Sequence, residues 1–166
     1  MSESQPAYLI LGSNIEPEVY LPKAVAKLSE YGVVQKISSA WENEPVGTTG
    51  PNFLNACVLF ESGFRQADLK HKVISPIEDQ LGRRRTNDKF SPRTIDIDIV
   101  LLDGNLLSKD LLDLPFVVIP LAEIHPGFRN PVTGETLKET ATRLRRDVWL
   151  EARPEVLAQW AGSGSG

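Results

Sequence analysis

The chain of 166 residues has little cysteine and contains no apolar run long enough to span a bilayer. Because Cys57 is its one cysteine, no internal disulfide can form, and a reducing cytoplasm is the expected location. Cys57 lies in an apolar run, which is more typical of a small core residue than of a nucleophile. Residues 1–6 are largely polar, so we expect no signal peptide and no membrane partner.

Positive charge is also in short supply, since 18 Lys and Arg stand against 22 Asp and Glu and give a net charge of −4. An acidic chain with one basic loop favours a small anionic ligand over a nucleic acid. An apolar content of 41% with 24% charged residues is typical of a soluble globular protein. We predict a single domain over residues 1–160. Residues 161–166 contain only Ala, Gly and Ser and are predicted to form a flexible, linker-like tail.

The basic residues that are present gather in one stretch, from Gly82 to Ile99. Its first half contains the cations Arg83, Arg84, Arg85, Lys89 and Arg93. Its second half alternates apolar and acidic residues: Ile95, Asp96, Ile97, Asp98 and Ile99. This period of two is typical of a half-buried strand, so the isoleucines share the core face and both carboxylates share the other. Two neighbouring anions repel each other unless a cation or water separates them.

Two carboxylates on one strand face beside an arginine loop suit a complex of magnesium with a polyphosphate. Asp96 and Asp98 offer hard oxygen ligands to Mg²⁺, and the arginines offer forked donors to phosphate oxygens. The alternative is an ordinary solvated loop, followed by a strand whose acidic face points at water. Both interpretations stay open on these residues alone.

Hydrophobic periodicity predicts the other elements of the chain. Strands are expected over 8–11, 33–41, 53–60 and 116–119, and helices over 18–31, 69–81 and 136–144. Pro22 suits the first turn of the first helix, Pro76 should kink the second helix, and Gly82 should end it. Glu78 is expected to be a solvated acid on the surface of that second helix.

The last third of the chain carries shorter signals. Asp103-Gly104 predicts a hairpin turn, and Pro120 should stop the strand over 116–119 before one helical turn over 121–124. Thr136, with Glu139 three residues later, predicts a capping box at the start of the last helix.

A second irregular stretch, residues 44–52, contains two prolines and two glycines and is predicted to be a surface loop. In the strand that follows, Phe53 and Asn55 lie on one face. There they can stack on and hydrogen-bond a planar heterocycle, although a phenylalanine at such a place is more often part of the core.

The predicted order of strand, helix, strand, strand, helix, strand is that of an α+β, ferredoxin-like antiparallel sheet with helices packed on it and long active-site loops. With these motifs in this order, the chain resembles 6-hydroxymethyl-7,8-dihydropterin pyrophosphokinase of folate biosynthesis. The matching motifs are Gly12-Ser13-Asn14, Pro45-Val46-Gly47, Phe53-Leu54-Asn55-Ala56, Glu78 with Leu81-Gly82-Arg83-x-Arg85, Ser91-Pro92-Arg93-Thr94-Ile95-Asp96-Ile97-Asp98 and Phe116-Val117-x-x-Pro120-Leu121. Only the Pro-Arg-x-Ile-Asp-x-Asp block is specific by itself.

The resemblance implies an enzyme that transfers diphosphate from its co-substrate ATP to the hydroxymethyl oxygen of a pterin and leaves AMP. It implies two Mg²⁺ ions on Asp96 and Asp98, and catalytic roles for Arg83 and Arg93. The residues that it implies for pterin binding are Pro45, Val46, Phe53, Asn55 and Phe116. Those that it implies for nucleotide binding are Glu78, Arg85, Phe90 and Ile99. The expected partners are the small molecules pterin and ATP, with no nucleic acid, and the expected state is a monomer.

Two departures from the family accompany the resemblance. Phe90-Ser91 stand where the family usually carries Trp-Gly. After Leu114-Pro115, the family normally runs through His-Pro and one or more arginines, whereas here Pro115 joins Phe116 directly. That segment helps to hold the nucleotide, so we expect weak ATP binding and ordinary pterin binding. Two alternatives stay open: a catalytically impaired relative that keeps the pterin pocket, and a small anion- or RNA-binding module, which the net charge disfavours.

Overall fold

The computed structural model describes residues 4–45, 47, 49–83 and 93–160. Within them, an antiparallel sheet of seven strands has the order β6-β5-β1-β4-β3-β7, and β2 pairs with β4 beside β3. The strands are β1 (Gln5–Ser13), β2 (Val33–Ile37), β3 (Ala40–Asn43), β4 (Phe53–Ser62), β5 (Asp96–Leu102), β6 (Asn105–Leu106) and β7 (Leu150–Arg153). The α-helices are α1 (Pro17–Leu28), α2 (Gln66–Asp68), α3 (Ser75–Gln80), α4 (Pro115–Ile124) and α5 (Leu137–Leu144).

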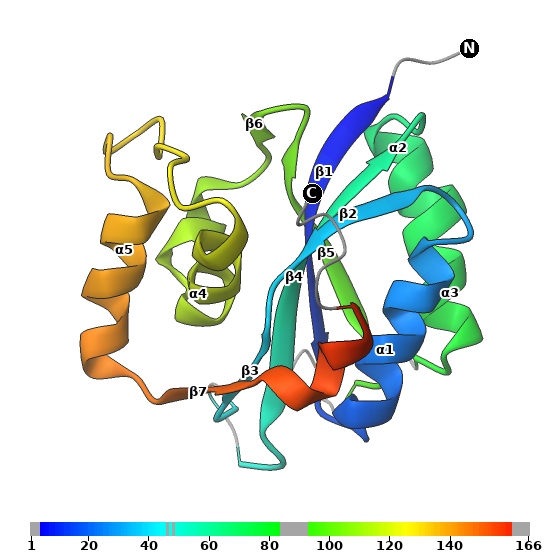
Figure 1. The fold of residues 1–166 in the computed structure, drawn as a ribbon, viewed down its shortest axis with the longest axis horizontal. Helices are drawn as coiled ribbons and strands as arrows, with labels where there is room; N and C mark the ends of the chain where they lie inside the picture. Colours follow the sequence, from blue (N-terminus) through cyan, green and yellow to red (C-terminus); the bar gives the residue numbers. More distant parts are fainter. Residues whose placement is uncertain (1–3, 46, 48, 84–92, 161–166) are drawn as a thin grey trace.

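Helices cover both faces of the sheet, with α1 and α3 on one side and α4 and α5 on the other (Figure 1). The four central positions of the sheet are β5, β1, β4 and the β2–β3 pair, as expected for a ferredoxin-like fold. The predicted α+β, ferredoxin-like class is therefore confirmed. No helix among the described residues combines the length and the apolar character that crossing a bilayer requires.

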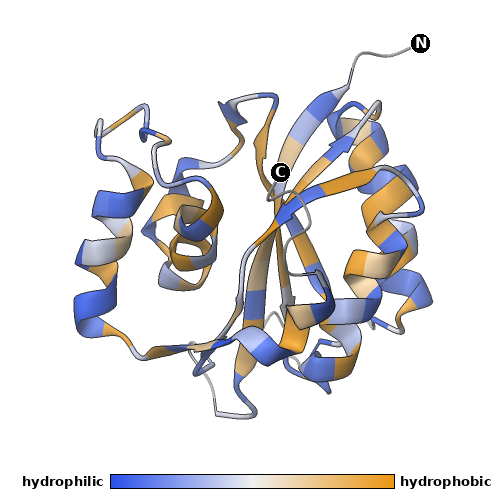
Figure 2. Ribbon diagram, in the orientation of Figure 1, coloured by the Kyte–Doolittle hydropathy of each residue, from blue (hydrophilic) through white to orange (hydrophobic). Residues whose placement is uncertain are grey.

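Each face of the sheet buries its own apolar cluster because side chains alternate along every strand. Along β1, Leu9 and Leu11 join the cluster under α1 and α3, whereas Ile10 joins the cluster under α4. Helix α4, which lies between the sheet and α5, is apolar on nearly all sides (Figure 2). Cys57 is fully buried in the α4 cluster, which agrees with its predicted core role.

The predicted helix over 69–81 is a succession of α2, a π-helical segment η1 (Leu69–Ile74) and α3. Pro76 has no N–H to donate, and the wider π turns end at Ser75, whose N–H bonds to the carbonyl of Lys70. The predicted kink is thus a local change of helix type. Gly82, with φ of 84°, ends the helix as predicted.

Three expectations about elements are wrong. The strand over 33–41 is two strands, β2 and β3, which pair with successive parts of β4. Pro22 lies inside α1, where Pro17 occupies the first turn. The strand over 116–119 is the first part of α4, which begins at Pro115 and continues through Pro120 to Ile124. Because α4 is apolar on nearly all sides, its sequence has no helical period that distinguishes it from a buried strand.

Two short signals are confirmed. Asp103 and Gly104 both have positive φ, 50° and 83°, as the two central residues of a type I′ hairpin turn between β5 and β6 require. Thr136 and Glu139 form the predicted capping box at the start of α5.

Candidate functional site

Two cavities meet at the acidic pair of β5. The first has a volume of about 490 Å³ and lies between the sheet and the start of α4. The second, of about 460 Å³, lies between β5 and the α2–α3 helix, with Lys70, Glu78 and Ile99 in its wall. Asp96 and Asp98 are the two residues that line both cavities. The face on which the sequence places both carboxylates is thus the boundary between two compartments.

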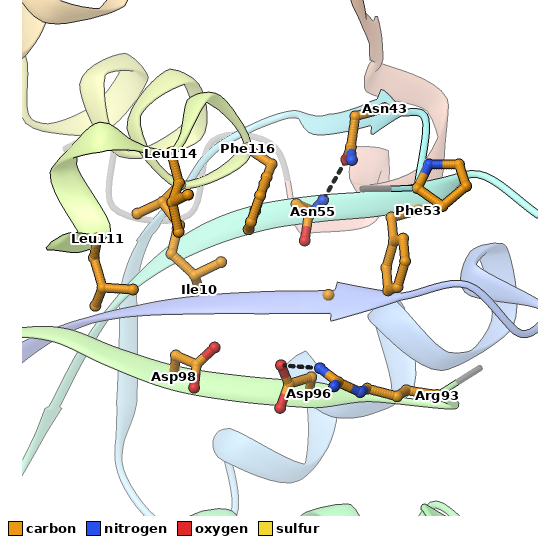
Figure 3. Close-up of a pocket in the computed structure, with 13 residues that line it drawn as sticks. Ile10, Asn43, Phe53, Asn55, Arg93, Asp96, Asp98, Leu111, Leu114 and Phe116 are labelled. Carbon is orange, nitrogen blue, oxygen red and sulfur yellow. Dashed lines mark hydrogen bonds and ion pairs between the residues drawn. The ribbon is translucent and has the colours of Figure 1, made fainter. Parts of the chain in front are cut away.

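The wall of the first cavity combines aromatic rings with amides (Figure 3). Phe53 and Asn55 come from β4, Asn43 from β3 and Phe116 from the first turn of α4. Asn55 Nδ2 donates to Asn43 Oδ1 at 2.5 Å, and both residues are buried. The Asn55 Oδ1 atom lies so close to Gly12 that a Cβ there would sit 2.5 Å from it. Gly12 therefore has to be glycine for Asn55 to hold this position.

Two guanidinium groups hold Asp96. Arg83 Nη1 lies 3.0 Å from Asp96 Oδ1, and Arg93 Nη1 lies 3.2 Å from Asp96 Oδ2. Arg93 is itself anchored through its backbone, because its N–H donates to Asn14 Oδ1 at 2.6 Å and its carbonyl accepts from Asn14 N at 3.1 Å. The repulsion expected between the two aspartates is thus reduced at Asp96, because Arg83 and Arg93 place positive charge beside its carboxylate.

The ionised form of Asp98 is disfavoured in this arrangement. Although Asp98 as a whole residue is exposed, desolvation of its carboxyl group, then the carboxylates of Asp96 and Glu78, raise its pKa from 3.8 to about 6, while Arg83 opposes the shift. A carboxylate that lines a cavity and has a pKa raised in this way is a candidate functional residue.

This shift predicts how the metal-free protein responds to pH. Because the pKa of Asp98 is higher in the folded state, its contribution to stability is fully present below pH 3.8 and is lost as pH rises through about 6. Asp98→Asn should therefore gain stability relative to the parent above about pH 6 and not below pH 3.8. Urea unfolding of both proteins across this window measures the difference, and parallel pH profiles would contradict the prediction.

Glu78 is not the solvated acid that its place in the sequence suggested. It is 3% exposed, its Oε2 accepts the backbone N–H of Ile97 at 2.9 Å, and Arg83 Nη1 lies 2.7 Å from the same oxygen. No described strand pairs with the outer edge of β5 from Asp96 to Ile99, because β6 pairs only with Leu101 and Leu102. Glu78 thus satisfies an edge N–H that the sheet leaves open.

The structure brings most of the predicted site residues together. The first cavity collects Pro45, Phe53, Asn55, Arg93, Asp96, Asp98 and Phe116, and the second collects Glu78, Arg83, Ile99 and the same two aspartates. Val46, Arg85 and Phe90 lie outside the described residues. Sequence reasoning missed Asn43 and Leu114 of the first cavity and Lys70 of the second. Asn43 could have been found only from its position opposite Phe53, and that position is known only once β3 is seen to pair with β4.

Comparison with known proteins supports one family. The model of the family 7,8-dihydro-6-hydroxymethylpterin-pyrophosphokinase (HPPK) matches residues 8–126. The 2-amino-4-hydroxy-6-hydroxymethyldihydropteridine pyrophosphokinase of Aquifex aeolicus is 35% identical over 142 residues, covering 80% of this chain and 88% of that protein. The protein of the same name in Bacillus subtilis is 38% identical over 157 residues, covering 87% and 90%.

Solved structures add evidence for the fold. The HPPK-DHPS of Plasmodium falciparum, solved with pterin and p-hydrobenzoate, superposes with a TM-score of 0.65 at 13% identity over 89% of this chain. The present chain spans 46% of that longer protein. Since the family model covers more than half of the chain and the curated relatives match over most of their length, the chain belongs to the HPPK family.

Proposed function

We propose that this protein transfers diphosphate from ATP to the hydroxymethyl oxygen of 6-hydroxymethyl-7,8-dihydropterin, giving the pterin diphosphate and AMP. The observation that carries the proposal is the pair of cavities that share Asp96 and Asp98. In this arrangement each substrate has its own compartment, and the transferred group crosses at the acidic boundary. Holding both reactants in such fixed positions is a major source of rate enhancement.

The first cavity suits a pterin. Phe53 and Phe116 provide flat apolar surfaces for the ring system, and the amides of Asn43 and Asn55 provide donors and acceptors for its edge (Figure 3). Pro45 completes this wall from the loop after β3. We assign Val46 to the same wall by its position in the family motif.

Truncating each aromatic residue tests this assignment. Phe53 belongs to neither apolar cluster of the described residues, whereas Phe116 packs against the cluster under α4. Phe53→Ala should therefore weaken pterin binding by about 1 kcal/mol or more with little change in Tm, and Phe116→Ala should lower both. Calorimetric titration and thermal melting of both variants measure the two effects. A Phe53→Ala protein with a lower Tm and unchanged pterin affinity would make Phe53 a core residue.

Magnesium fits the residues present. No group of three or more His, Cys, Asp or Glu within the described ranges forms a metal cage. Mg²⁺ does not need one, because it is commonly held by one or two carboxylates together with substrate phosphates and water. Asp96 and Asp98 would hold it. When bound, Mg²⁺ supplies positive charge to the phosphate oxygens and relieves the repulsion that raises the pKa of Asp98.

Two arginines of the chain stabilise the diphosphate group during its transfer. Arg83 and Arg93 both reach Asp96, at the boundary between the cavities, which supports a position for their guanidinium groups beside a diphosphate that crosses there. Each group that stabilises developing charge in this way is commonly worth about 3–4 kcal/mol in the transition state. The side chains of Arg83 and Arg93 are 18% and 26% exposed, which disfavours the RNA-binding alternative, because that alternative requires these two arginines on an outer surface.

The second cavity suits the nucleotide. The open edge of β5 at Ile99 offers backbone hydrogen-bonding groups to a base, and Lys70 supplies a positive charge in the same cavity. We assign Arg85 and Phe90 to the nucleotide by their positions in the family motif. Glu78 lines this cavity too, but its contacts indicate that it acts by holding Arg83 and β5.

Product analysis tests the proposed reaction. Incubation with ATP, magnesium and 6-hydroxymethyl-7,8-dihydropterin should yield AMP and the pterin diphosphate in equal amounts. AMP formation should require the pterin. Release of ADP would show a different reaction, and tight pterin binding without any AMP would show an impaired relative.

A further inference from the structure

Residues beyond the family match close the sheet next to the first cavity. The match ends at residue 126, and β7 follows it at Leu150–Arg153. Strand β7 pairs antiparallel with β3, from Ala40 opposite Arg153 to Asn43 opposite Leu150. It crosses from the α5 side of the sheet toward α1 (Figure 1). Without β7, strand β3 would be an unpaired edge beside the cavity.

A carboxylate of β3 links this strand to β7 and to the residue that precedes β4. Glu42 Oε1 accepts from Arg153 Nη1 of β7, and Glu42 Oε2 accepts from Asn52 Nδ2 at 2.8 Å. Arg153 Nε donates to Glu155 at 3.0 Å, which fixes the orientation of the guanidinium. We call Glu42, Asn52 and Arg153 the Glu42 clamp. The side chain of Glu42 is 19% exposed and that of Arg153 is 36% exposed, so the carboxylate is partly shielded from water whereas the guanidinium lies at the surface.

The clamp lies directly behind the cavity wall. Glu42 precedes Asn43, and Asn52 precedes Phe53, so two of the three clamp residues have a wall residue as their chain neighbour. Asn43 pairs with Phe53 across the β3–β4 ladder. Because neighbouring side chains in a strand point to opposite faces, Glu42 lies on the face of β3 opposite to Asn43. The clamp therefore holds β3 to the residue before Phe53 from behind the cavity wall.

We infer that Glu42 and Arg153 are positioning residues for the pterin wall, so that the strand β7 sets the affinity for the pterin. The inference rests on the proposed function in that it takes the ligand of the first cavity to be the pterin. Loss of the guanidinium would leave Glu42 with Asn52 as its one clamp partner. The end of β3 and the start of β4 would then be held less rigidly. The pterin would then have to order Asn43 and Phe53 on binding, and affinity would fall.

The test compares two arginine truncations. Arg153→Ala removes the clamp, whereas the control Arg143→Ala removes the Arg143–Glu135 ion pair, which links α5 to the turn before it. Arg153→Ala should weaken pterin binding about tenfold and raise the KM for the pterin, with kcat and the KM for ATP unchanged. Arg143→Ala should leave all four quantities at parent values. Glu42→Gln should act in the same direction, and the double variant should be no worse than Arg153→Ala alone.

Amide hydrogen exchange on the free protein gives a readout that needs no substrate. In Arg153→Ala, exchange should accelerate at 42–43 and 53–55 while the amides of α4 stay at parent rates. Unchanged exchange at these positions, or an equal effect of Arg143→Ala, overturns the inference. Faster exchange with unchanged pterin affinity overturns the link to binding. If exchange accelerates but the parent binds no pterin, the role of the clamp in ordering β3 and β4 is supported and the proposed function is refuted.

Discussion

Asp98→Asn should lower the rate of diphosphate transfer by about 10³-fold or more while making the metal-free protein more stable above about pH 6. The rate falls because an amide is a poor ligand for Mg²⁺ and no longer counters its charge. Stability rises because the substitution removes a charge whose desolvation, and whose repulsion by the carboxylates of Asp96 and Glu78, raise the pKa of Asp98 in the folded state.

Asp96→Asn should lose activity to the same extent but should not gain stability. Its carboxylate holds both Arg83 and Arg93, so the amide leaves two partly shielded guanidinium groups less well paired. Single-turnover rates, magnesium titration and urea unfolding measure these effects. Asp103→Asn is the matched control, because it changes an aspartate at the far end of the same strand in a turn that accepts Asn-Gly. Full activity in either Asp96→Asn or Asp98→Asn would refute the metal assignment.

Inserting the family's His-Pro to Arg segment between Pro115 and Phe116 should strengthen ATP binding by a few orders of magnitude and change pterin binding little. In this chain the helix α4 begins at Pro115, with only Leu114 between it and the preceding 3-10 helix η2 (Lys109–Asp113). The arginines that the family carries at this point are therefore missing from the chain. Each charge-assisted hydrogen bond to a phosphate is worth roughly 1.5–3 kcal/mol, so two of them account for the expected change.

The position of Phe116 decides whether pterin binding survives the shorter connection. Phe116 lines the first cavity from the first turn of α4, so the proposed pterin wall keeps this aromatic ring without the segment. Calorimetry with magnesium-ATP and with the pterin, on the parent and on the graft, measures both affinities. A Gly-Ser insertion of equal length controls for the disturbed start of α4. If the parent already binds magnesium-ATP in the low micromolar range, other residues replace the segment and this interpretation is wrong.

Local sequence determined the parts of the site that depend on one element. The alternation over residues 95–99 placed Asp96 and Asp98 on one face, because a strand has a period of two wherever it lies. The Asp103-Gly104 turn and the Thr136 cap were predictable for a similar reason, since each depends on the φ angles or hydrogen bonds of a few neighbouring residues. The order of the motifs was sufficient to identify the family.

Tertiary structure decided what depends on which element lies beside which. Glu78 has a helix position like that of a solvated acid, and only the open edge of β5 opposite it explains its burial. The apolar run at the start of α4 fits a strand as well as a helix, and packing between the sheet and α5 selects the helix. The Glu42 clamp joins residues more than one hundred positions apart, Glu42 and Arg153. No local pattern encodes such a contact, because its energy exists only once β7 has paired with β3.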